Sequence, residues 1–175
     1  MLRNWGIVYS GNLIGSITVA MLVFLSGQYK ASQGAVGRAM LTIATGKLVN
    51  SLLSVLFLAI LCNILVCLAV WMTYGAKTFT DKVLVILFPI TAFVAAGFEH
   101  SVADMYYFPN ALFIKLFDPT FIQKLSLDIS ALTWGKSLTL LLVASLGNLI
   151  GGVLFVGLIY WLIYLRPSSN KNMPR

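Results

Sequence analysis

Three ionisable side chains interrupt an otherwise apolar stretch near the middle of the chain. Glu99 and His100 follow the charge-free residues 83–98, and Asp104 comes four residues later, before the sequence turns apolar again. Ionisable groups at membrane depth are costly, so they usually face a protein interior and serve a ligand or an ion pathway. Because imidazole changes charge near neutral pH, these residue types predict a site that handles a small ion and a proton.

The spacing of these groups indicates how they would act. On a continuous helix, His100 and Asp104 would share one face and Glu99 would point about 100° away. An apolar pore disfavours the charged form of a histidine, whereas an arriving anion favours it. His100, the only histidine in the chain, would then act as a proton relay and an anion stabiliser in one group.

Two other interpretations of these residues stay open. Glu99 and His100 could be a hydrogen-bonded pair that only ties broken backbone together. The three groups could also ligate a metal ion, with Cys62 or Cys67 as a fourth ligand. A single histidine beside a diverging glutamate is a poor ligand set, so we expect no metal and no cofactor.

Nucleophilic catalysis has no motif behind it. We find no G-x-S-x-G-like elbow and no serine set beside the histidine as an activated nucleophile would require. The serines considered are Ser10, Ser51, Ser54, Ser101 and Ser145. The sequence therefore predicts a protein that is not an enzyme.

The composition explains where such a site would lie. Of 175 residues, 59% are hydrophobic and only 10% are charged, against about 25% charged in soluble domains. This excludes a water-soluble globule. The net charge of +7 comes from bases scattered singly between apolar blocks, which is typical of membrane-flanking residues and not of a nucleic-acid surface.

The charge-free stretches predict four transmembrane spans within a transmembrane domain of residues 1–165, followed by a polar cytoplasmic tail over 166–175. Spans of about 20 residues cross a bilayer core of about 30 Å. The third span would be about 48 Å long as one straight helix, so we expect it to break. Pro89, Gly97 and Pro109 punctuate it, and broken helices mark substrate sites in transporters. The predicted spans are 6–26, 48–76, 83–114 (broken) and 137–165.

The connecting segments 27–47, 77–82 and 115–136 are expected to be polar loops. Four spans place both termini on one side of the membrane. Six bases on each side leave the orientation undecided by the positive-inside rule.

An internal repeat relates the first and last spans. Gly-Asn-Leu-Ile-Gly occurs at Gly11–Gly15 and again at Gly147–Gly151. The glycines of a G-x-x-x-G motif allow another helix to approach closely, and a buried asparagine within it must find hydrogen-bond partners. We therefore expect helix packing at Gly11, Gly15, Gly147 and Gly151, buried amides at Asn12 and Asn148, and an inverted-repeat transporter fold.

The order of these motifs resembles the formate/nitrite transporter family. The likeness lies in residues 93–105, Phe-Val-Ala-Ala-Gly-Phe-Glu-His-Ser-Val-Ala-Asp-Met, in residues 63–71, Asn-Ile-Leu-Val-Cys-Leu-Ala-Val-Trp, and in both copies of the repeat. The resemblance covers nearly the whole chain. It implies an all-α integral membrane protein with part of an aquaporin-like six-helix inverted-repeat fold, in which this chain supplies helices three to six.

The resemblance also implies roles for single residues. His100 would be the central pore histidine and Glu99 its acidic neighbour. Phe93 would be the aromatic of the periplasmic-side constriction. Asn63 would be the polar residue of the fourth helix near the pore, and Lys47 a base at the outer vestibule that attracts anions.

Asp104 departs from the family pattern, which usually has asparagine there. If ionised, this carboxyl would repel an anionic substrate. It is therefore expected to be protonated or to face away, or else the pore behaves differently.

The family further implies transport of a small monovalent anion with a proton, most simply formate, by a homopentamer in the bacterial inner membrane with both termini cytoplasmic. Nitrite or hydrosulfide are alternative substrates. Because the family's first two helices have no counterpart in this chain, a truncated, non-conducting membrane remnant or an assembly partner is a further alternative.

Overall fold

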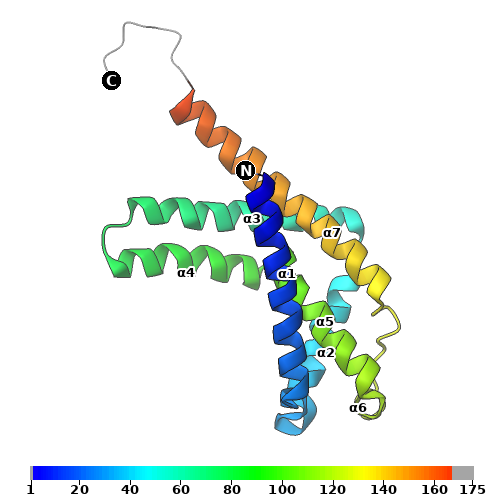
Figure 1. The fold of residues 1–175 in the computed structure, drawn as a ribbon. Coiled ribbons are helices and arrows are strands. Elements are labelled where there is room, and N and C mark those ends of the chain that lie inside the picture. The colour runs from blue at the N-terminus through cyan, green and yellow to red at the C-terminus, as the bar shows by residue number, and fades with distance from the viewer. Residues whose placement is uncertain (1, 167–175) are drawn as a thin grey trace, which may run out of the picture.

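The computed structural model describes residues 2–166, and their regular structure consists of helices only (Figure 1). The predicted tail of residues 166–175 lies, apart from Arg166, outside the described residues. The helices are α1 (Leu2–Leu25), α2 (Ala35–Val49), α3 (Leu52–Gly75), α4 (Phe79–Ala95), α5 (Ser101–Phe117), α6 (Pro119–Leu125) and α7 (Trp134–Ile150). Beyond α7 the same helix continues with π-type hydrogen bonding, through η3 (Gly151–Leu158) and η4 (Trp161–Leu165).

The helices are arranged around two close pairings, α1 against α5 and α3 against α7. Figure 1 shows α3 and α4 as a hairpin that extends to one side, while α1, α2 and α5 run together toward α6. Three helices are long and apolar enough to cross a membrane, namely α1, α3 and the continuous helix Trp134–Leu165. Their bounds lie within a few residues of the predicted spans.

The segment predicted as a broken third span forms two helices, α4 and α5, of 17 residues each. The break lies at residues 96–100, and Gly97 there has a φ of +68°, which glycine adopts without steric cost. Pro89 and Pro109 instead lie inside α4 and α5. Prolines are tolerated in membrane helices because neighbouring groups satisfy the freed carbonyls, so the glycine, not either proline, marks the end of α4.

The prediction of a polar loop over 27–47 is wrong, because most of it forms α2. This helix buries Gly37, Leu41 and Ala44, whose spacing is that of one helical face. A search for charge-free stretches misses such a helix, since Arg38 and Lys47 leave only the short uncharged stretch 39–46 between them. In the predicted loop 115–136, Pro119–Leu125 likewise forms α6, and Asp118 caps it.

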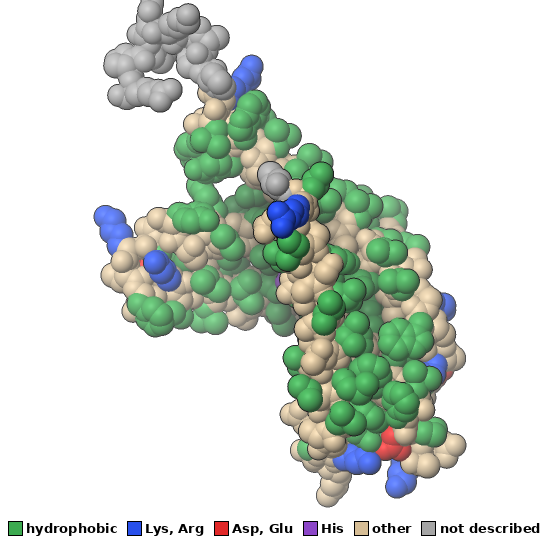
Figure 2. Space-filling view, in the orientation of Figure 1, with side chains coloured by type: hydrophobic (Ala, Val, Ile, Leu, Met, Phe, Trp, Pro, Cys, Tyr) green, Lys and Arg blue, Asp and Glu red, His purple; other side chains and the backbone are tan. Residues whose placement is uncertain are grey.

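Exposed apolar side chains cover the flanks of the molecule. Figure 2 shows hydrophobic side chains along the helices and most Lys and Arg side chains gathered at the extremities. Helix α1 buries only Ala20 among its described residues. Such flanks are unfavourable in water and fit a lipid or subunit environment, so the fold is that of a membrane protein.

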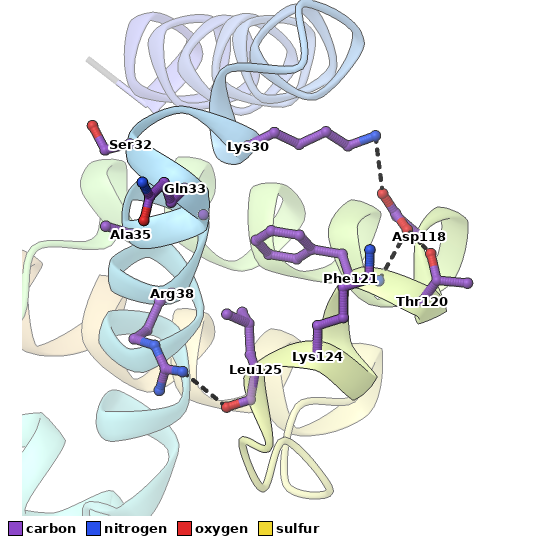
Figure 3. Close-up of a pocket in the computed structure, with 11 residues that line it drawn as sticks. Lys30, Ser32, Gln33, Ala35, Arg38, Asp118, Thr120, Phe121, Lys124 and Leu125 are labelled. Carbon is purple, nitrogen blue, oxygen red and sulfur yellow. Dashed lines mark hydrogen bonds and ion pairs between the residues drawn. The ribbon is translucent and has the colours of Figure 1, made fainter.

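A polar contact region fixes α6 beside the start of α2 (Figure 3). The Arg38 guanidinium donates to the Leu125 carbonyl at 3.0 Å, and Lys30 pairs with Asp118 at 3.2 Å. The Asp118 carboxylate also accepts from the Thr120 and Tyr29 hydroxyls, each at 2.7 Å. These contacts border a cavity of about 640 Å³ and hold the helix that carries Lys47.

The Asp118 contacts predict a pH-dependent stability. Hydrogen bonds from Thr120 and Tyr29 hold the pKa of Asp118 well below its usual range. A carboxyl with a depressed pKa stabilises the fold above its unfolded pKa of about 4, and this contribution is lost as the pH falls. We expect Asp118→Asn to lower the unfolding free energy by about 1 kcal/mol at neutral pH, with the difference vanishing in acid.

Denaturant titration of helical circular dichroism in detergent measures this difference. Asp128→Asn is the control, because it removes an exposed carboxylate whose one hydrogen bond comes from the Ser130 backbone. Equal stability of Asp118→Asn and the parent protein at neutral pH would contradict the assignment.

Candidate functional site

The break between α4 and α5 is an ordered turn. The amide of Phe98 donates to the Phe93 carbonyl at 3.0 Å and closes the end of α4. His100 then caps α5, because its Nδ1 accepts from the Val102 amide at 3.2 Å. The break is therefore fixed by hydrogen bonds at both ends.

Asn148 of α7 ties the break to the rest of the fold. Its Nδ2 donates to the carbonyls of Ala59 at 2.8 Å and Glu99 at 3.0 Å. Its Oδ1 accepts from the Ser101 amide at 2.9 Å. Asn63 of α3 donates in turn to the Asn148 carbonyl. Since unsatisfied backbone groups at membrane depth cost several kcal/mol each, this network is what allows the chain to break here.

The second copy of the repeat permits this contact by close packing of α7 on α3. A Cβ at Gly147 would lie 2.6 Å from the Leu56 carbonyl oxygen, and one at Gly151 would meet the Ile60 backbone. The first copy differs. Beyond the adjoining residues and backbone of α1 itself, no atom among the described residues lies within 4 Å of such a Cβ at Gly11 or Gly15, and Asn12 is exposed, contrary to the expected buried amide.

A buried charge cluster lies directly at the break. Lys47 reaches across from α2 and forms a hydrogen-bonded ion pair with the Glu99 carboxylate. Its Nζ also lies 3.0 Å from Asp104 Oδ1. The side chains of Glu99 and Asp104 are 1% and 0% exposed, and that of Lys47 is 16% exposed. Charges buried this deeply must be paired, so the three residues form one electrostatic unit.

Four of the six predicted site residues line one cavity of about 420 Å³, which we name the break cavity. They are Lys47, Phe93, Glu99 and His100. The Phe93 and His100 rings lie 5.6 Å apart between centroids. A base, an acid, an aromatic ring and an imidazole therefore face the same space between α2, the end of α4 and the start of α5.

The other two predicted residues lie elsewhere. Asn63 sits between α3 and α7, and it does not line the break cavity. Asp104 lines a second cavity of about 200 Å³ between α1, α5 and α7, the rear cavity. The expectation that His100 and Asp104 share a helical face is wrong, because His100 precedes α5 in extended conformation, with φ −117° and ψ 107°.

The hydrogen bond to His100 Nδ1 determines which ring nitrogen can donate a hydrogen bond to a ligand. Because Nδ1 accepts an amide hydrogen, the neutral imidazole carries its proton on Nε2. Nε2 takes part in no hydrogen bond among residues 2–166. His100 can therefore donate a hydrogen bond from Nε2 to a ligand in the break cavity.

The metal interpretation would require several ligand side chains in one place. Within residues 2–166, no three His, Cys, Asp or Glu side chains are placed to hold a metal ion together.

Tyr107, which sequence reasoning missed, also lines the break cavity, with its ring 5.9 Å from Lys47 Nζ. Its one sequence signal is the four-residue spacing from Ala103, a cavity neighbour on the same face of α5.

Comparison with known proteins agrees with the resemblance in the sequence. A family model described as "Formate/nitrite transporter" matches residues 1–162. The "Formate channel FocA" of Escherichia coli strain K12 is 39% identical over 173 residues, covering 96% of this chain and 61% of that protein. The "Uncharacterized transporter YrhG" of Bacillus subtilis strain 168 is 43% identical over 175 residues, covering 97% and 58%. The chain thus spans about three fifths of the length of these curated relatives.

Solved structures give the same result for the fold. A structure described as "Pentameric formate channel with formate bound" matches with a TM-score of 0.86 and 41% identity, covering 94% of this chain and 67% of that one. A second, described as "FNT family ion channel", has a TM-score of 0.72 and 34% identity, covering 93% and 60%. The proteins similar to this chain are named as channels and transporters, not as enzymes.

The repeat offers a matched test of the tie at the break. Asn148→Leu removes the amide that satisfies Ala59, Glu99 and Ser101. We expect a loss of about 2 to 4 kcal/mol of unfolding free energy in detergent, because three buried groups lose their partner. Asn12→Leu, at the same position of the exposed first copy, should change it by less than about 0.5 kcal/mol. Equal losses in the two variants would show that Asn148 does not hold the break.

Proposed function

Because the chain belongs to the formate/nitrite transporter family, we propose that it forms part of the wall of a pore that carries a small monovalent anion, most simply formate, across a membrane. The single observation that carries this proposal is the meeting of Lys47, Phe93, Glu99 and His100 in the break cavity. Broken helices in transporters place substrate groups at such breaks. The cavity brings together a hydrogen-bond donor, a positively charged side chain and an aromatic ring.

Each of these residues has a distinct role in the proposed path. Lys47 draws the anion to the break through its positive charge, and its pairing with Glu99 prevents the anion from being trapped there. Phe93 packs beside the imidazole and narrows the path. His100 donates from Nε2 to the anion, and a charge-assisted hydrogen bond of this kind is stronger than a neutral one.

His100 can also supply the proton in this path. An anion beside the imidazole favours its charged form, and transfer of that proton to formate would give a neutral acid. A neutral acid crosses an apolar constriction at lower cost than an anion, since burying an unpaired charge is far more costly than burying a polar group. This transfer leaves His100 neutral, and a proton taken up from solvent restores the charged form for the next anion.

The proposal includes an architecture. We propose four membrane spans within a domain of residues 1–165, related by an inverted repeat as in an aquaporin-like six-helix fold, with Gly11 and Gly15 packing against a neighbouring helix. Asn63 contributes near the pore by holding Asn148. The exposed apolar flanks would face lipid and sister subunits of a pentamer. We place the protein in the bacterial inner membrane with both termini cytoplasmic.

Transport into liposomes tests the function. Protein reconstituted into vesicles should release formate down its gradient, and faster at acidic than at alkaline pH. His100→Phe keeps a ring of similar size but removes the donor, so formate flux should fall about tenfold or more and lose the part of its pH dependence that the imidazole provides. Circular dichroism and the size-exclusion profile confirm that the variant is folded.

Parallel measurements of nitrite and hydrosulfide flux decide among the substrates, since the largest flux identifies the preferred one. Unchanged formate flux in His100→Phe at every pH would remove His100 from the mechanism. Absence of flux for all three anions in the parent protein would favour the alternative of a non-conducting membrane protein or assembly partner.

A further inference from the structure

One ammonium faces two carboxyls at the helix break. Lys47 Nζ pairs with Glu99 and lies 3.0 Å from Asp104 Oδ1, so both carboxyls contact the same nitrogen. With all three groups charged, the cluster would carry a net charge of −1. Both carboxyl side chains are at most 1% exposed, so water cannot stabilise the excess charge.

The two carboxyls are not equivalent. Glu99 accepts a hydrogen bond from Lys47, whereas both oxygens of Asp104 lack a hydrogen-bond partner among the described residues. The contact from Lys47 to Asp104 has the distance of an ion pair without the direction of a hydrogen bond. A carboxylate can accept about four hydrogen bonds, so an ionised Asp104 would be the worst-solvated charge in the cluster.

No other cation compensates Asp104 among the residues that surround it. On the rear cavity side, α1 presents Leu13 and Ile17, and α7 presents Ser137 and Leu141. The Ser137 hydroxyl is itself buried without a partner. The titratable and charged groups near the cluster are Lys47 on α2, Glu99 and His100 at the break, Tyr107 on α5 and Cys62 on α3.

We propose that Asp104 holds a proton while the site conducts, and that loss of this proton closes the site to anions. The inference rests on the proposed function. Two carboxyls that share a buried site cannot both ionise at low cost, and Glu99 has the better partner. When Asp104 is protonated, Lys47 and Glu99 sum to zero and an anion meets no net repulsion. When the proton leaves Asp104 for solvent, the cluster gains a net charge of −1 within reach of the anion.

Asp104 thus controls the pH range of anion passage indirectly, through its contact with Lys47. It does not line the break cavity, but it touches the lysine that does. An ionised Asp104 would also compete with the anion for Lys47. The pH range in which anions pass would therefore be set on its alkaline side by Asp104, separately from His100, which faces the cavity itself.

Infrared spectroscopy tests the protonation without any need for transport. The chain has only five acidic side chains, and exposed carboxyls are ionised at neutral pH, so one protonated carboxyl gives a resolved carbonyl band. We expect this band in the reconstituted parent protein at neutral pH. It should be lost in Asp104→Asn and kept in Asp128→Asn, which removes an exposed carboxylate. Absence of the band in the parent protein, or its survival in Asp104→Asn, would overturn the proposal.

Flux measurements test the consequence. Above the pH at which the band disappears, formate flux through the parent protein should fall about tenfold per pH unit, as the protonated fraction does. Asp104→Asn keeps the shape and the neutral charge, so its flux should not fall in that range. Identical alkaline profiles in the two proteins would overturn the gating role.

These outcomes are distinct from failure of the proposed function. Absence of flux in both the parent protein and Asp104→Asn would refute anion transport and the gating role with it. The infrared band would still decide whether Asp104 holds the proton, because that measurement does not depend on any flux. Two results together would support both the protonation and the gating role. The band would disappear in Asp104→Asn and not in Asp128→Asn, and the flux through Asp104→Asn would not fall in the alkaline range.

Discussion

The structure depends on one constraint: backbone that leaves a helix at membrane depth must have its polar groups satisfied inside the protein. Asn148 meets that constraint by bonding the carbonyls of Ala59 and Glu99 and the amide of Ser101. The side chain can reach them only because Gly147 and Gly151 let α7 lie against the α3 backbone. Without this packing, α4 and α5 would have to join or unravel, and the functional groups at residues 96–100 would not face a cavity.

The same break concentrates charge where charge is costly. Asn148 donates to the backbone carbonyl of Glu99, and Lys47 donates to its carboxylate. Glu99 is therefore held by both α7 and α2. His100 is fixed as the cap of α5, which leaves Nε2 as its donor. The same hydrogen bonds that end α4 and begin α5 therefore also hold the side chains of the proposed site in place.

Much of this could be predicted from the sequence, and the failures have physical reasons. Charge-free stretches located α1, α3 and α7, because long apolar helices dominate the composition. The break was predictable from ionisable residues at membrane depth, but its position was not, since Gly97 and the two prolines gave competing signals. Helix α2 was missed because its buried face, Gly37, Leu41 and Ala44, is narrow and small. The prediction that His100 and Asp104 share a helical face was wrong because it assumed a continuous helix, whereas His100 caps α5 in an extended conformation. No spacing rule reveals that Lys47 contacts both carboxyls.

An anion that binds at the break would meet His100, and the imidazole of this residue can be observed directly. The chain has one histidine, so selective ¹⁵N labelling gives a single pair of ring signals in the reconstituted protein. We expect a neutral ring protonated on Nε2 at neutral pH, with the Nε2 signal shifting saturably as formate is added and not as chloride is added. A ring protonated on Nδ1 in the neutral form, or an Nε2 signal indifferent to formate, would contradict it.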